Sequence, residues 1–123
     1  MTGRVLNLHA LVPVTFRLPN RSDLAIEFVV NTGYTGFLTL PPAAIAALGL
    51  PFEYDIPANL ADDTEVFVPV HSATILWNGK EREVRVLAIG KRPLLGTAFM
   101  GGKELLVQFA DNGLVTLDDL VFP

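Results

Sequence analysis

The chain has 123 residues, half of them hydrophobic, with a mean hydropathy of +0.42 and a net charge of −4. This length corresponds to one domain, and without a cluster of Lys and Arg to neutralise phosphates we expect no nucleic-acid partner. The lack of cysteine excludes disulfides, thiolate nucleophiles and cysteine-ligated zinc. No apolar run approaches the ~20 residues that a membrane-spanning helix needs.

The N-terminal segment does not resemble a signal peptide, because Asn7, His9 and Pro13 interrupt the apolar stretch that one requires. We therefore expect a cytoplasmic chain with no membrane partner. His9 and His71 each stand alone in a strand-like stretch, where a surface or packed side chain is a more ordinary role than a metal ligand. We expect neither a metal nor an organic cofactor, and the surplus of apolar residues indicates a subunit interface.

The first third of the chain has the pattern of β-structure. Residues 4–18 alternate roughly between apolar and polar side chains, and residues 19–22 have turn chemistry. The apolar run at 24–30 predicts a strand buried on both faces, and residues 37–40 predict a short one. Together these segments predict a hairpin, a sharp loop and a return strand.

A short helix is expected next. It begins at the two prolines, Pro41 and Pro42, and ends at Gly49, because proline suits a first helical turn and glycine suits the left-handed residue that ends one. After it, residues 52–60 and 65–76 form the arms of a long hairpin with its tip at 61–64.

The rest of the chain again predicts hairpins. Asn78-Gly79 is a strong turn signal before a strand at 83–89. Residues 93–96 lead into a single helical turn at 97–100, and the last hairpin joins 104–109 to 114–117. The fold class we expect is mainly β over residues 1–123, with one or two short helices and a closed or nearly closed barrel.

The loop Asn31-Thr32-Gly33 follows the apolar strand and has two interpretations. All three residues form turns readily, so the tripeptide can be an ordinary β-turn. Alternatively, the strand presents Asn31 into a cleft, Thr32 fixes the loop with a hydrogen bond, and Gly33 permits close approach of the backbone. The tripeptide alone does not separate the two.

The order of the parts is more specific. The run 29–41, VVNTGYTGFLTLP, resembles the active-site segment of the retropepsin-like aspartic proteases, and within them a bacterial branch common in cyanobacteria. The segment 93–97, PLLGT, resembles the family's second element, which packs behind the catalytic loop. The hairpin tip at 61–64 resembles the flap. The resemblance covers about residues 4–120.

The resemblance implies a homodimer that cleaves a peptide or protein substrate. In this family two carboxylates share one proton, so that an acid and a base coexist, and each subunit supplies one of them. The catalytic segment maps onto Asn31, Thr32 and Gly33. Residues implied to contact substrate are Tyr34, Ala61, Asp62, Asp63, Thr64, Leu95 and Gly96.

Position 31 departs from the family pattern, because an amide cannot ionise or share a proton. Two explanations are open: an engineered inactive form of a protease, which we favour because Thr32 and Gly33 are kept, or a natural pseudoprotease that binds peptides without cleaving them. An unrelated small β-barrel whose loops mimic the motif is a third interpretation. In both protease-based explanations we expect the chain as given to be inactive.

Overall fold

The computed structural model describes residues 1–59 and 61–121, and this part of the chain forms ten strands and one short helix. In chain order the elements are β1 (Thr2–Leu6), β2 (His9–Arg17), β3 (Leu24–Val30), β4 (Leu38–Leu40), α1 (Pro42–Leu48), β5 (Phe52–Asn59), β6 (Glu65–Trp77), β7 (Lys80–Ala88), β8 (Leu94–Leu95), β9 (Lys103–Val107) and β10 (Leu114–Asp119). The mainly β fold class is confirmed. Among the described residues no helix is long and apolar enough to cross a membrane.

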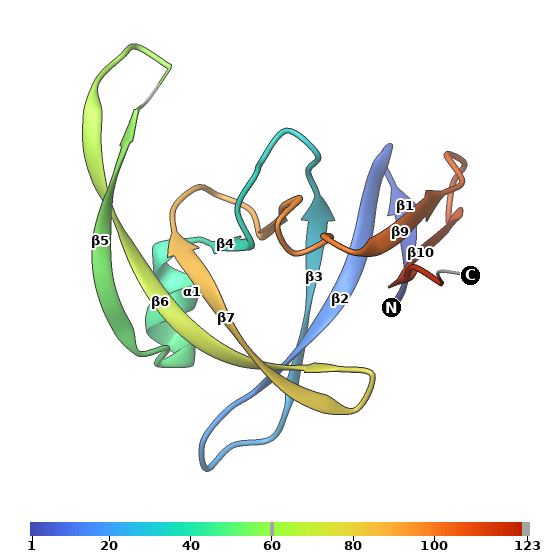
Figure 1. Ribbon diagram of the computed structural model, residues 1–123, viewed down its shortest axis with the longest axis horizontal. Helices are drawn as coiled ribbons and strands as arrows, with labels where there is room; N and C mark the ends of the chain where they lie inside the picture. The colour runs from blue at the N-terminus through green and yellow to red at the C-terminus, as the bar shows by residue number, and fades with distance from the viewer. Residues whose placement is uncertain (60, 122–123) are drawn as a thin grey trace.

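The strands form one sheet in the order β5-β6-β7-β4-β8-β3-β2-β1-β10-β9. The sheet curls, and β2 pairs a second time, with β6, through residues Thr15 to Arg17. Figure 1 shows the long β5–β6 hairpin on one side of the molecule, and the N-terminus beside β1, β9 and β10 on the other. The closed barrel remains a prediction, although the β2–β6 pairing turns the sheet back on itself.

The core lies inside this curled sheet and consists of apolar side chains on alternate strand positions. β2 shows the pattern most clearly, because Ala10, Val12, Val14 and Phe16 are buried while the residues between them are not. The ring of Phe16 stacks on that of Phe28, with 6.0 Å between the ring centroids. The largest fully buried side chains are Phe16, Phe28, Phe99, Leu38, Leu40, Ile75, Leu95 and Leu117.

The helix and most of the turns agree with the sequence predictions. α1 has proline in its first turn and ends at Gly49 with φ of 66°, as expected from the residues. The β6–β7 turn places Asn78 and Gly79 at φ of 50° and 77°, which is the left-handed geometry that an Asn-Gly hairpin turn requires. Leu60, at the end of the first hairpin arm, lies outside the described residues.

Two expectations were wrong. The segment 4–18 is not one strand, because Asn7 and Leu8 form a tight turn, both with positive φ, between β1 and β2. β3 is not buried on both faces, since its first half is exposed and Phe28 alone is fully buried. Residues 97–100 form a turn in which the Phe99 N–H donates to the Gly96 carbonyl and the Met100 N–H to the Thr97 carbonyl. The described residues contain one helix, within the one or two expected.

Candidate active site

The loop 31–37 leaves the end of β3 and is shaped by Asn31. The Asn31 side-chain oxygen accepts a hydrogen bond of 2.9 Å from the Gly33 N–H, and its main-chain carbonyl accepts one of 3.2 Å from the Tyr34 N–H. Both bonds fold the chain back on itself directly after the strand, as Asn commonly does. Asn31 is half-buried, whereas Thr32 and Gly33 are exposed.

The loop is joined to the segment that contains β8. The Asn31 N–H donates to the Leu95 carbonyl at 2.9 Å, and the Gly96 N–H donates to the Phe37 carbonyl at 2.8 Å. The Thr97 N–H in turn donates to the Tyr34 carbonyl at 2.8 Å. The structure therefore brings together two segments that are about sixty residues apart in the chain, and holds the loop by its backbone.

β8 itself lies between β3 and β4. It runs parallel to β3, with Val30 opposite Leu95, and antiparallel to β4, with Leu38 opposite Leu95. The Leu95 side chain is fully buried. β8 thus takes the place between two strands that are consecutive in sequence, and it fixes the point at which the loop leaves the sheet.

Gly96 permits a close approach between the β8 segment and the loop. A Cβ atom at this position would lie 2.7 Å from the Tyr34 carbonyl oxygen and closer still to that of Gly36. A side chain at residue 96 would therefore push the two segments apart. This explains in physical terms why a glycine follows the two leucines.

Tyr34 packs into the loop. Its ring lies against Gly36 and Gly96, and its hydroxyl is buried with no hydrogen-bond partner among the described residues. Burial raises the pKa of this hydroxyl above its ordinary value. The Tyr34 ring supports the loop from within, and its contact with substrate stays a prediction.

The residues predicted to form a flap, 61–64, lie at the tip of the β5–β6 hairpin. The Asp62 carboxylate accepts a 3.0 Å hydrogen bond from the Thr64 N–H, and hydrogen bonds from Thr64 lower the pKa of Asp62. Asp63 follows with φ of 62°. Between residues 61–64 and residues 31–36 the structure has no hydrogen bond, and Figure 1 shows the hairpin extending separately from the loop. Contact of the tip with substrate remains a prediction.

Two residues near the loop were not among the sequence candidates. Arg92, just before β8, donates a 3.1 Å hydrogen bond from its Nη1 to the Nε2 of His9. The two are 83 positions apart in the chain, so their proximity depends on strand register and has no local sequence signal. Among the described residues, no group of three or more His, Asp or Glu side chains is arranged to hold a metal ion.

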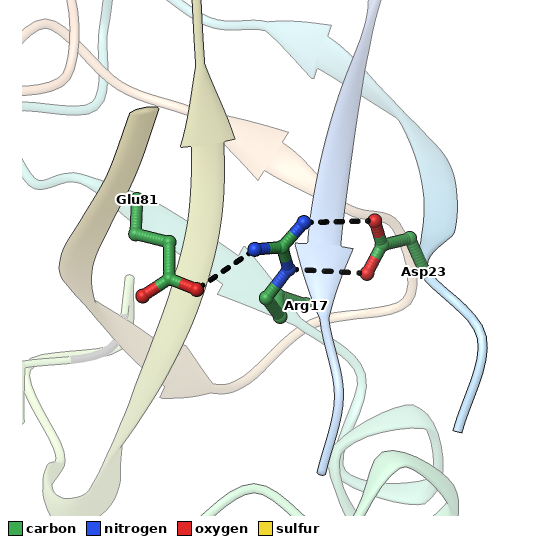
Figure 2. Close-up of polar contacts among 3 residues, drawn as sticks. All are labelled: Arg17, Asp23 and Glu81. Carbon is green, nitrogen blue, oxygen red and sulfur yellow. Dashed lines mark hydrogen bonds and ion pairs between the residues drawn. The ribbon is translucent and has the colours of Figure 1, made fainter. Parts of the chain in front are cut away.

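A surface pocket of about 450 Å³ lies elsewhere, between the end of α1 and strands β2, β6 and β7. At its edge the Arg17 guanidinium donates to Asp23 at 3.4 Å and to Glu81 at 2.9 Å (Figure 2). Hydrogen bonds to Asp23 and then Glu81 raise the pKa of Arg17. With its charge neutralised, Arg17 is not a site for an anion, and none of the predicted site residues lines this pocket.

Comparison with solved structures finds the same architecture. The chain superposes on the crystal structure of a retropepsin-like aspartic protease from Rickettsia conorii with a TM-score of 0.58 and 18% sequence identity, over 97% of this chain and 89% of the other. The fold is retropepsin-like. No family model matches the sequence, and a search of curated proteins finds no match. At this identity the likeness shows the fold alone, and the bacterial branch suggested by the motif stays a prediction.

Proposed function

We propose that this chain has the architecture of a retroviral-type aspartic endopeptidase, with a peptide-cleaving site formed between two identical subunits. In the sequence given, Asn31 stands where the catalytic carboxylate is expected, and the chain is inactive for that reason. The observation that carries the proposal is the position of the Asn31-Thr32-Gly33 loop on a retropepsin-like fold, at the end of β3 and joined to β8.

The chemistry explains the need for two subunits. Peptide hydrolysis of this type uses two carboxylates so close that they cannot both ionise, and one acts as base on water while the other acts as acid on the scissile carbonyl. One chain contains one such loop, so the second comes from a partner related by a two-fold axis. No metal or organic cofactor takes part in this mechanism.

The loop geometry suits a carboxylate at position 31. The side-chain hydrogen bond that shapes the loop uses the Asn31 oxygen as acceptor, and an aspartate offers the same acceptor in the same place. The amide nitrogen makes no hydrogen bond to the described residues. Aspartate at residue 31 would therefore keep the loop and add the missing acid–base group.

An exposed apolar surface supports the homodimer. By strand register, Leu114 of β10 lies opposite Arg4 of β1, and Leu106 of β9 lies opposite Thr116 of β10, so both leucines face the same side as Leu6. All three leucines are exposed. Because exposed apolar side chains that lie together mark interaction surfaces, we assign this face to contact with a second copy of the chain.

The decisive experiment is Asn31→Asp, assayed on unfolded proteins and peptide libraries between about pH 4 and 7, the range in which a carboxylate pair works. We expect cleavage at least about 100-fold above that of the present chain, since general acid–base catalysis contributes that much or more. An aspartic-protease inhibitor should abolish it, and the matched variant Asn31→Ala should stay inactive.

The competing function is a pseudoprotease that binds peptides in the same cleft. The amide at position 31 is the observation that favours it. If the Asn31→Asp protein is folded and dimeric and still cleaves nothing, the endopeptidase proposal is wrong and the binding function takes its place.

A further inference from the structure

Arg92 is an exposed cation with N–H donors available to a ligand. It lies in the turn at residues 90–92 that leads into β8, and its Nη1 donates to the Nε2 of His9 at 3.1 Å. Both side chains are exposed. A guanidinium has five N–H donors in a planar fork, so one bond to an imidazole leaves most of them available to a ligand.

The ends of β2 and β3 bring His9 toward residue 31. The last pair of the β2–β3 ladder is Leu11 opposite Val29, and His9 and Asn31 each lie two residues beyond it, at the same end of the two strands. The amides of Val29 and Asn31 both donate toward the β8 side, so the Leu11–Val29 pair is not hydrogen-bonded across β2 and β3. In such pairs the side chains of the two strands lie closest together.

The same register defines a shared face. β2 buries Ala10 and Val12, so His9 and Leu11 point to the opposite side, which is the side of Val29. Leu94 of β8 lies beside Val29 on its other flank. The result is a half-buried apolar strip with Asn31 and His9 at one end, where the Arg92 guanidinium reaches the His9 ring.

The charge of Arg92 is not neutralised. Arg17 and Arg4 both donate to carboxylates, Arg4 doing so through two bonds of 3.2 Å to Glu27. Glu27 is the acidic residue on the shared face, and its carboxylate is already paired with Arg4. Within residues 1–59 and 61–121, no carboxylate lies within ion-pair distance of Arg92.

We propose that Arg92, oriented by His9, binds the carboxylate of an aspartate or glutamate side chain of the peptide, close to the bond aligned on residue 31. This rests on the proposed function and names its substrate class. A planar guanidinium recognises a carboxylate through two parallel N–H donors, and the apolar strip beside it accepts the methylene groups of the same side chain. Arg92 is a specificity-determining residue in this arrangement, and His9 positions it.

The test profiles cleavage sites in a proteome-derived peptide library with the Asn31→Asp protein, before and after Arg92→Gln. We expect Asp and Glu to be enriched within two residues of the scissile bond. For matched peptides, kcat/KM should favour Glu over Gln by about 10- to 100-fold, the range of a charge-assisted hydrogen bond. Arg92→Gln should bring that ratio to about one, chiefly by lowering kcat/KM for the Glu peptide, while Arg92→Lys should keep part of the preference.

Lys91→Gln is the matched control, because it removes one positive charge from the same exposed turn. It should leave the preference intact. If Lys91→Gln erases the preference as fully as Arg92→Gln, the overall charge of the turn is responsible and the proposal is wrong. Cleavage with no acidic preference also overturns it and leaves the endopeptidase function standing.

A binding assay tests the Arg92 anion site independently of the proposed peptidase activity. The chain with Asn31 is titrated into fluorescent library peptides that carry Glu or Gln, and anisotropy is measured. Tighter binding of the Glu peptides, lost in Arg92→Gln, supports the anion site even if Asn31→Asp proves inactive. Equal binding of the two peptide sets, or none, overturns it.

Discussion

In the proposed function, residue 31 controls the chemistry through the two terminal atoms of its side chain. The Asn31 oxygen shapes the loop by accepting the Gly33 N–H, while the rest of the amide determines whether a proton can be exchanged there. The loop structure and the proposed catalysis therefore depend on different halves of one side chain. In the sequence, the neighbouring Thr32 and Gly33 are what make this position a candidate.

Tyr34 provides a test at the same scale. Its buried hydroxyl lacks a partner, and an unpaired buried hydroxyl costs free energy that its removal recovers. We expect Tyr34→Phe to raise the free energy of unfolding by about 1 kcal/mol in urea titrations. Tyr54→Phe is the control, because Tyr54 is exposed and should not respond. A loss of stability in Tyr34→Phe would show that the hydroxyl finds a partner in the assembled protein.

The pH dependence of stability gives a second measure of Tyr34. Burial holds the pKa of Tyr34 in the folded chain above its pKa in the unfolded chain. The stability that depends on neutral Tyr34 is therefore complete below about pH 10, the ordinary tyrosine pKa. This stability is lost as the pH rises through the folded-state pKa. The difference in unfolding free energy between the parent chain and Tyr34→Phe should therefore widen above that pH. A difference that stays constant through the alkaline range contradicts the burial of this hydroxyl.

At the scale of elements, the two-residue strand β8 connects two other strands of the sheet. Leu94 and Leu95 join β3 to β4, and the fully buried Leu95 packs in the core beneath the loop. Leu95→Ala should lower the free energy of unfolding by ~2–5 kcal/mol, because it leaves a cavity in the core. Leu94→Ala, at a half-buried position, should cost clearly less. Equal losses in the two variants would contradict the described packing.

The elements also show what the sequence could and could not predict. The α1 boundaries and the Asn78-Gly79 turn follow from residues that have one strong conformational preference each. The β1–β2 turn was missed because Leu8, a bulky side chain, occupies a left-handed position that composition gives no reason to expect. The His9–Arg92 contact was missed because it depends on how three strands align, which no local pattern encodes.

At the scale of the whole molecule, the exposed leucines Leu6, Leu106 and Leu114 share one outer face of the sheet. Leu6→Lys on this face should shift a dimer toward monomer in sedimentation velocity, because a charge replaces an apolar contact at the proposed interface. Leu24→Lys is the matched control, since both leucines are 42% exposed and Leu24 lies at the start of β3, away from that face. A parent chain that sediments as a monomer at all concentrations would exclude the shared active site.

The pairing of β6 has a mechanical consequence for the hairpin that ends at Thr64. β6 contacts β5 from Glu65 to His71, but it gains β7 only from Val70 onward. Between Glu65 and Pro69, β6 is therefore paired with β5 alone, and the hairpin is attached to the rest of the sheet only from Val70 onward. We expect any displacement of the tip to be taken up as bending near Val70, because from there on β6 is paired on both sides and Ile75 is buried in the core.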